Sequence, residues 1–437
     1  MSASAVTSRT AAAERASLGA VLNERTTWLF FVLGFGTGIP LGWSWTDLFP
    51  RADIVIDRAL FLVVTSLGIV LLIQLTAAPF LDQHRAPFFR SLGHRRSWVA
   101  STAGAALVLI GLQVAVALAS EGAAKRYATI SGILAFPVHA LLWISIDALR
   151  IDAQRGRAQA VAYAAQFSGV LAASLIISRF AGDQITLPLT LAFGALMALS
   201  LGAVLMIKEP SAAAEGLPAP ASVLATLARP WRTFLARHGK ASGPLLAALA
   251  AYALAASAAD FLGKQGHLID ILISAGPSFE TANMGAAMPM STQESGLMLI
   301  GAGAGLIIAF RHPPARAFAA LTCAWLAVVA LFVACAAVLG FTVFTVAGQF
   351  AFRSVIAGAG FVIFWSIAAR LTARPNTAGQ FAILGALIAL FWISDGVFRL
   401  ISSIIGGYAL AGGAAIAGVA AIILMRTAAR ISRRAGN

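Results

Sequence analysis

Long apolar runs separated by short polar links dominate the hydropathy pattern of this chain. A helix needs about 20 mostly apolar residues to cross a bilayer. Twelve stretches approach that length, near residues 27–49, 59–81, 97–120, 127–149, 158–180, 184–207, 241–262, 294–310, 317–339, 341–369, 377–402 and 403–425. The pattern therefore predicts an all-α, polytopic membrane protein with about twelve transmembrane helices.

The longest polar link lies near the middle of the chain and divides the spans into two groups of six. It covers residues 208–240 and is rich in Pro, Ala and Glu in its first part. We expect a cytoplasmic tail (1–26), a six-helix half (27–207), this cytoplasmic linker, a second six-helix half (241–425) and a basic tail (426–437). Two bundled halves around a central cavity are a common transporter layout.

Composition and charge support the membrane assignment. The 437 residues are 59% hydrophobic and 11% charged, with a mean hydropathy of +0.86, whereas soluble domains carry roughly 25% charged residues. Of the 31 Lys and Arg residues, 23 fall on the side of the N-terminus, six on the other side and two inside spans. By the positive-inside rule both termini are cytoplasmic. The net charge of +14 thus reflects topology and contact with lipid, and no nucleic-acid partner is expected.

The link between the second and third spans, residues 77–98, concentrates charge around Pro87 and Gly93. Its charged residues are Asp82, Arg85, Arg90, Arg95 and Arg96. A basic link punctuated by Pro and Gly must turn quickly and stay on one side of the membrane. It is either a gating element or a positive-inside loop without a gating role.

The end of the fourth span carries a second charged pair. Asp147 and Arg150 stand three residues apart, so they share one helical face. They can pair with each other or with the link that contains Asp82. Because Asp147 lies close to the predicted membrane boundary, a gating salt bridge is favoured over a proton site.

The second half holds charges deeper in its spans, and an ionisable residue there is a functional hypothesis because burying it unpaired is costly. Asp260 ends the seventh span, and Asp395 and Arg399 lie four residues apart in the eleventh, as either a structural pair or part of a path. Arg353 lies in the tenth span with no partner nearby on its own helix, so we expect it to face another helix or a cavity and to contact an anionic substrate group.

Other features of the chain give weaker signals. Asp47 closes the first span between Trp residues, which are either interfacial anchors or part of a sugar path. Gly34, Gly38 and Gly42 recur every four residues, which favours close helix packing over a bending helix. Metal-ligand clusters, catalytic triads and Walker A loops are absent from the sequence. No enzyme activity, metal or cofactor is expected.

Several segments together resemble the AmpG-like muropeptide permeases of the major facilitator superfamily. They are the opening span Phe31-Val-Leu-Gly-Phe-Gly-Thr-Gly-Ile-Pro-Leu41, the link from Ala78 to Trp98, the end of the fourth span with Arg155-Gly-Arg-Ala158, and Gln380-Phe-Ala-Ile-Leu-Gly-Ala-Leu387. An acid followed by a Gly-containing basic run between spans two and three also resembles the best-known signature of that superfamily. In the superfamily this Asp caps or pairs at helix ends, and the basic residues bridge to a neighbouring helix.

The resemblance implies a proton-driven symporter of the bacterial inner membrane that imports anhydro-muropeptides for wall recycling by alternating access. Two features of this chain depart from the family. Leu142 and Trp143 stand where the family often has Gln-Asp, and neither the 264–293 segment nor the Asp395/Arg399 pair maps onto the family's pattern. Transport of another solute, as in siderophore import or drug efflux, stays open. So does a transporter-fold scaffold or assembly factor that moves nothing.

Overall fold

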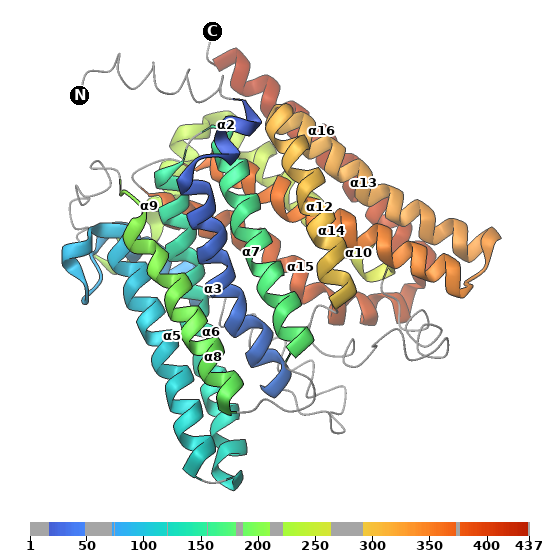
Figure 1. The fold of residues 1–437 in the computed structure, drawn as a ribbon. Helices are drawn as coiled ribbons and strands as arrows, with labels where there is room; N and C mark the ends of the chain where they lie inside the picture. Colours follow the sequence, from blue (N-terminus) through green and yellow to red (C-terminus); the bar gives the residue numbers. More distant parts are fainter. Residues whose placement is uncertain are drawn as a thin grey trace. The chain divides into compact units, whose positions relative to one another are not determined.

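The computed structural model describes residues 17–48, 72–119 except 74, 121–154, 156–180, 187–209, 222–263, 292–372 and 376–435. All regular structure in these ranges is helical (Figure 1). The α-helices are α2 (Leu18–Leu22), α3 (Arg25–Leu48), α5 (His94–Ala119), α6 (Glu121–Ala153), α7 (Ala158–Phe180), α8 (Leu187–Leu201), α9 (Val223–His238), α10 (Ser242–Gly263), α12 (Thr292–Arg311), α13 (Pro314–Ala334), α14 (Val343–Leu371), α15 (Thr377–Ile405) and α16 (Gly407–Ala435). Short helical turns η1 (Arg90–Leu92), η2 (Gly202–Met206), η4 (Gly239–Ala241) and η5 (Cys335–Leu339) adjoin them.

The prediction of an all-α polytopic fold is confirmed. Within the part of the chain that the structure describes, six helical stretches are long and apolar enough to span a membrane: Ala158–Ile176, Val223–Gly263, Glu294–Arg311, Pro314–Leu339, Phe344–Leu371 and Gly407–Arg434. Most other predicted spans also form helices. The predicted span 59–81 lies largely outside the described residues, which resume at Leu72 and are helical up to Gln83. The predicted linker contains a helix, α9, that the apolar runs did not reveal.

The chain divides into two compact units. Unit 1 includes Gly68–Arg232 together with Ala368–Ile383, and unit 2 includes Thr233–Ile367 and Leu384–Asn437. The boundary at Arg232 falls inside the predicted linker. The end of α14 and the first turns of α15, which the sequence assigned to the second half, cluster with unit 1.

Glycines bring helices of unit 1 into backbone contact. A Cβ on Gly34 of α3 would lie 1.9 Å from the carbonyl oxygen of Gln166 on α7, and one on Gly38 would lie 2.7 Å from that of Val170. In return, Gly169 of α7 faces the backbone of Phe31. The close packing predicted from the glycine repeat is therefore present, and α3 and α7 run side by side in Figure 1.

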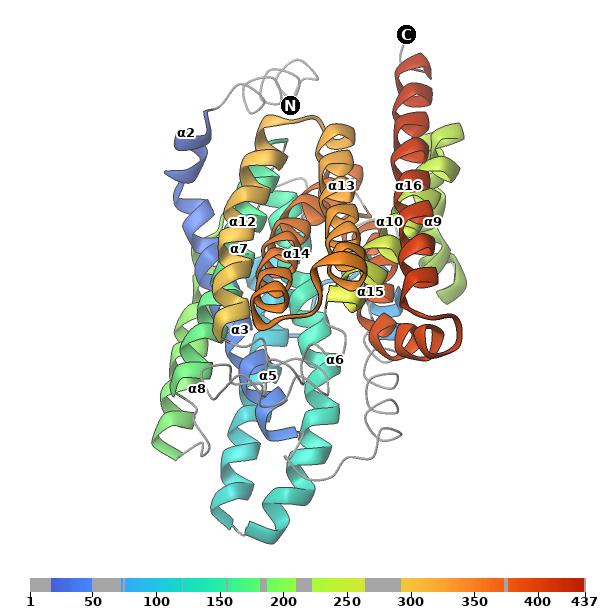
Figure 2. The same ribbon diagram turned by 90° about the vertical axis from the view of Figure 1, so that its right-hand side faces the viewer.

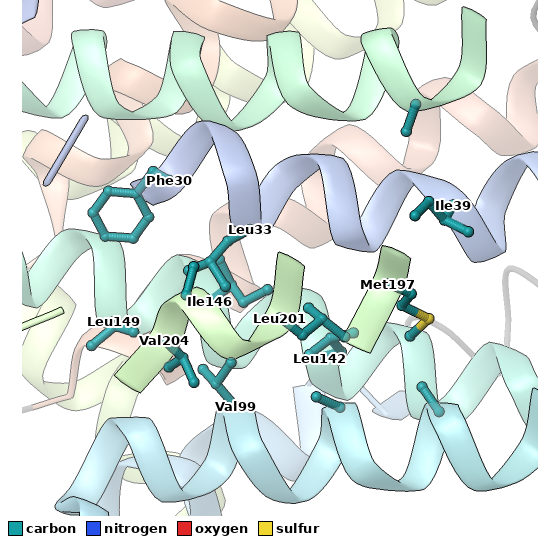
Figure 3. Close-up of a cluster of buried hydrophobic side chains, with 14 of the residues drawn as sticks. Phe30, Leu33, Ile39, Val99, Leu142, Ile146, Leu149, Met197, Leu201 and Val204 are labelled. Carbon is teal, nitrogen blue, oxygen red and sulfur yellow. The ribbon is translucent and has the colours of Figure 1, made fainter. Parts of the chain in front are cut away.

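An apolar cluster fills the space between five helices of unit 1 (α3, α5, α6, α7 and α8) and the helical turn η2. Figure 3 shows Phe30, Leu33 and Ile39 of α3 facing side chains from α5, α6, α8 and η2. The labelled partners are Val99, Leu142, Ile146, Leu149, Met197, Leu201 and Val204. Most of these side chains are almost completely buried. This packing fixes the ends of α5 and α6, which carry the charged residues described below; both views show α5 and α6 as neighbouring helices (Figures 1 and 2).

Unit 2 is held together by small residues and aromatic rings. A Cβ on Gly301 of α12 would meet the carbonyl oxygen of Val355 on α14 at 1.9 Å, and one on Gly305 would meet Ala359. Helix α10 packs against α13 and α16. Tyr252 of α10 accepts a hydrogen bond from the indole of Trp325 on α13 at 3.2 Å. These contacts fix α10, α12 and α14, the three helices that carry the buried charges of this unit.

Candidate functional site

Arg95 is the centre of a buried charge network in unit 1. Its Nη2 donates to Asp82 Oδ1 at 2.6 Å and its Nε donates to Asp152 Oδ2 at 2.8 Å. Its Nη1 donates to the carbonyl oxygen of Leu81 at 3.0 Å. All three charged side chains are at least nine-tenths buried. One guanidinium therefore joins the end of the second predicted span to α5 and α6.

The Asp82 carboxylate also binds the first turn of α15. Its Oδ1 accepts from the N–H of Ala378 at 3.0 Å, and its Oδ2 accepts from the N–H of Gly379 at 2.8 Å. The first N–H groups of a helix have no intrahelical acceptor and carry the positive end of the helix dipole. Thr377 adds a hydrogen bond from its hydroxyl to Asp152 Oδ1 at 3.1 Å. Two carboxylates thus hold the start of α15 in unit 1.

Gly93 and Glu209 form the entry to α5. Gly93 has φ +108°, a conformation that residues with a Cβ rarely adopt, and a Cβ there would lie 2.3 Å from Glu209 Oε2. Glu209 accepts from the N–H of Arg95 at 2.7 Å and from that of Arg96 at 3.4 Å, so it caps α5. The guanidinium of Arg96 lies 4.0 Å from the same carboxylate. Glu209, which follows η2, therefore binds the end of the predicted basic link at Arg95 and Arg96.

Asp147 and Arg150 pair with each other at 3.0 Å and lie in a polar cluster between α6 and α7. Arg150 Nε donates to Gln166 Oε1 at 2.9 Å, and Gln166 Nε2 donates to Asp147 Oδ1 at 3.1 Å. The fully buried guanidinium lies 4.6 Å from the ring centroid of Tyr163 and 5.7 Å from that of Phe381 on α15. The salt bridge to Asp147, the amide of Gln166 and the ring of Tyr163 together offset the free-energy cost of burying the Arg150 guanidinium.

Arg353 is the centre of a second charge network, in unit 2. Its Nε donates to Asp260 Oδ1 at 2.5 Å and its Nη1 donates to Glu294 Oε1. The side chains of Arg353, Asp260 and Glu294 are 2%, 5% and 11% exposed. Arg353 does face other helices, as its position required, but what it meets there are two carboxylates. Two of its nitrogens, Nε and Nη1, are therefore already bound to carboxylates.

For the remaining predicted site residues, the structure describes the position in the fold but gives few or no side-chain contacts. Arg85 is exposed in the link after Asp82. Asp47 lies in α3, and Asp395 and Arg399 lie in α15, but the side chains of these three residues are outside the described part of the structure. The structure therefore brings Asp82, Arg95 and the start of α15 together, and Asp260 with Arg353. Their roles in gating, substrate contact or proton movement stay predictions.

Sequence reasoning missed four partners of these networks: Asp152, Glu209, Glu294 and Gln166. Asp152 lies 57 residues from Arg95, and Glu209 lies 114 residues from it. Glu294 lies 59 residues from Arg353. The one available signal was the acid itself, because an Asp or Glu at the edge of an apolar run needs a cation or a helix end close by.

The fold is shared with solved transporter structures. No family model and no curated protein matches this sequence. An outward-conformation structure of the major facilitator transporter FucP aligns with a TM-score of 0.63 at 11% identity, covering 93% of this chain and 99% of that chain. A bacterial homologue of the iron transporter ferroportin aligns at 0.62 and 13%, with the same coverage. The human organic anion transporter MFSD10 (TETRAN) aligns at 0.62 and 17%, covering 94% and 99%.

At these identities the comparison shows the fold alone. The chain has the major facilitator fold of a multi-pass membrane protein. Residue roles and substrate have to be argued from the charge networks themselves.

Proposed function

We propose that this protein is a secondary transporter of the bacterial inner membrane that imports anhydro-muropeptides, or a related small solute, together with protons. One observation carries the proposal: in a chain with the major facilitator fold, a buried Asp82–Arg95–Asp152 network binds the first turn of α15. Every bond of this network can break and reform without covalent chemistry. A transporter that alternates between two states needs a contact of this kind.

The network would act as the cytoplasmic gate contact. With both termini cytoplasmic, Asp82 and the start of α15 belong to the cytoplasmic side of the membrane. The network stabilises the state in which α15 is bound, because the carboxylate of Asp82 accepts from two helix N–H groups and from Arg95. Opening that side requires Ala378 and Gly379 to leave Asp82. Arg95 keeps Asp152 as its partner during that step, so the buried cation is never left without a carboxylate.

The substrate class rests on the sequence resemblance, and proton coupling rests on the resemblance together with one structural neighbour. The segments of this chain that resemble muropeptide permeases occur in order along the first half and again at Gln380–Leu387. The solved E. coli fucose:proton symporter FucP shares the fold, with a TM-score of 0.56 and 17% identity. Ion-coupled uptake is therefore a mode of transport that this fold supports.

Uptake of radiolabelled anhydro-muropeptide tests the proposal, in cells that lack their own permease and with a protonophore as comparison. We expect uptake that the protonophore abolishes. Asp82→Asn should stop uptake while the protein still reaches the membrane, whereas Arg232→Gln, which changes an exposed charge on α9, should leave uptake intact. If wild-type protein that is present in the membrane shows no uptake, the muropeptide is not its substrate. Uptake by Asp82→Asn at the wild-type rate would contradict the gating role of the Asp82 network.

A further inference from the structure

Two adjacent aromatic side chains are exposed in the link between the second predicted span and α5. Phe88 is 68% exposed and Phe89 is 55% exposed. Phe89 has φ +58° and ψ 32°, in the left-handed region, and within the described ranges it is the one residue other than glycine with a positive φ. A bulky side chain is strained in this region, and such strain persists only where the surrounding structure imposes it. The backbone is therefore held in a costly conformation at the point where it exposes two aromatic rings.

Two hydrogen bonds hold this link against α5. The indole Nε1 of Trp98 donates to the carbonyl oxygen of His84 at 2.7 Å. The hydroxyl of Ser101 donates to the carbonyl oxygen of Phe88 at 3.2 Å. Residues 84–91, the aromatic loop, therefore have a defined position on the first two turns of α5.

The second of these bonds lies within the predicted membrane span. Helix α5 begins at His94, and the third predicted span begins at Ser97. Ser101 stands four residues further on, which is about 6 Å along a helix. Because the carbonyl oxygen of Phe88 is bound to the Ser101 hydroxyl, the aromatic loop folds back along α5 toward the bilayer instead of extending away from it.

Ser101 also belongs to the face of α5 that is turned away from the protein. Ser101, Ala105, Val108 and Leu112 recur at the helical period, and Val108 and Leu112 are 61% and 44% exposed. On the opposite face Val99 packs into the core of unit 1 (Figure 3). The exposed apolar face of a spanning helix contacts lipid. The aromatic loop is therefore bound to the lipid-facing side of α5, at the end of the helix that the predicted topology places at the cytoplasmic surface.

The aromatic loop carries positive charge beside its rings. Arg85 and Arg90 are both exposed, and the sequence has no acidic residue between Asp82 and Glu121. Anionic headgroups in the cytoplasmic leaflet attract basic residues close to the membrane, and the guanidinium fork matches phosphate oxygens. Segments that bind at a membrane surface combine this attraction with burial of apolar side chains. An acidic protein could match the charge, but the direction of the loop along α5 favours lipid.

We propose that the aromatic loop inserts into the cytoplasmic leaflet and binds anionic phospholipid. The rings of Phe88 and Phe89 lie at the level where headgroups meet acyl chains, and the guanidinium groups of Arg85 and Arg90 bind headgroup phosphates. This contact with lipid depends neither on the transported solute nor on a gating role of the Asp82 network.

Amide hydrogen exchange of the full-length protein in lipid nanodiscs tests this insertion. Exchange of peptides that cover residues 84–92 is compared in phosphatidylcholine and in phosphatidylcholine with phosphatidylglycerol, at the same ionic strength. Amides that are withdrawn from water exchange slowly, so we expect exchange to be about tenfold slower or more when phosphatidylglycerol is present. High salt should reduce this difference, because it screens the attraction between the arginines and the headgroups.

Two double variants separate the contributions of charge and of the rings. Arg85→Gln with Arg90→Gln should remove the dependence on phosphatidylglycerol. Phe88→Ser with Phe89→Asn should exchange fast in both lipids, because the rings no longer insert, while Asn tolerates the left-handed conformation and keeps the turn. Phe88→Ser alone, which leaves the backbone at Phe89 unchanged, replaces this double variant if its Tm falls below that of wild type.

Two single variants serve as matched controls. Phe344→Ser removes a ring of α14 that is 88% exposed, and Arg232→Gln removes an exposed charge on α9. Both should exchange like wild type at residues 84–92. Equal exchange of the wild-type loop in the two lipids would overturn the proposal, as would a phosphatidylglycerol effect that persists in Arg85→Gln with Arg90→Gln. Protection of the loop by a soluble cytosolic protein, with none from either lipid, would overturn it in favour of a protein partner.

Discussion

Replacement of Asp82 by Asn should release the first turn of α15. In the native network Oδ1 accepts from Arg95 and from the N–H of Ala378, and Oδ2 accepts from the N–H of Gly379. An Asn side chain can reproduce the bonds of one oxygen only. Its NH2 group would then face the N–H of Gly379, so two donors would meet and one helix N–H would lose its acceptor.

The magnitude follows from these contacts. A buried N–H without an acceptor costs about 1 to 3 kcal/mol. The negative charge of Asp82 also interacts with the positive end of the α15 dipole, which contributes up to about 2 kcal/mol in a buried geometry, and Asn lacks this charge. The bound state of α15 should therefore weaken by about 2 to 4 kcal/mol, which is roughly a 30- to 1,000-fold change in the opening equilibrium.

Amide hydrogen exchange measured by mass spectrometry reports this equilibrium directly. Peptides that cover Ala378 and Gly379 should exchange about 30-fold faster or more in Asp82→Asn than in wild type. Peptides from the middle of α13 in unit 2 should not change. Asp152→Asn is the matched control, because its single oxygen can accept from Thr377 or from Arg95 but not from both, while both amide bonds to Asp82 are left in place. Equal exchange at the start of α15 in Asp82→Asn and wild type would refute the reasoning.

Three further predictions concern packing and capping. Gly301→Ala should lower Tm strongly and reduce expression, because its Cβ would lie 1.9 Å from a carbonyl oxygen of α14, whereas Gly303→Ala, with open space around it, should be neutral in the same melt. Glu209→Gln should destabilise unit 1 by about 1 to 2 kcal/mol in a denaturant titration, because the cap of α5 loses its charge; an unchanged midpoint would show that Glu209 does not stabilise α5. Arg150→Lys should cost about 2 to 4 kcal/mol in the same titration, because one ammonium cannot reach both Asp147 and Gln166 and loses the contact with the aromatic ring; a loss below 0.5 kcal/mol would contradict it.

Hydropathy was sufficient to predict the helices but not all of them. The spanning helices have apolar residues on every side over about 20 positions, so a simple count finds them. Helix α9 was missed because its apolar residues, such as Phe234, occupy one face and alternate with Arg and His along the chain. A search at the helical period, in place of a search for continuous apolar runs, would have found it.

The charge networks were predictable in part for a similar reason. The sequence shows that Arg353 must face another helix or a cavity, since burial of a lone guanidinium is costly. It does not show which helix, because Asp260 and Glu294 are 93 and 59 residues away. Likewise Asp82 stood out as an acid in a basic link, but two of its contacts are to backbone N–H groups almost 300 residues later, and backbone donors leave no mark in a sequence.

The networks around Arg95 and Arg353 each contain one Arg and two carboxylates, but the carboxylates have different additional partners. In each, one buried Arg holds two carboxylates, so each begins with a surplus of one negative charge. Around Arg95 the surplus is met by two N–H groups of α15 bound to Asp82 and by the hydroxyl of Thr377. That balance is built from the chain itself, so it can only be made or broken by moving α15, which suits a gate. Around Arg353 both carboxylates come from helices of unit 2, Asp260 from α10 and Glu294 from α12, and each accepts directly from the guanidinium on α14. The first network therefore depends on backbone N–H groups at the start of one helix, whereas the second joins three helices through side chains.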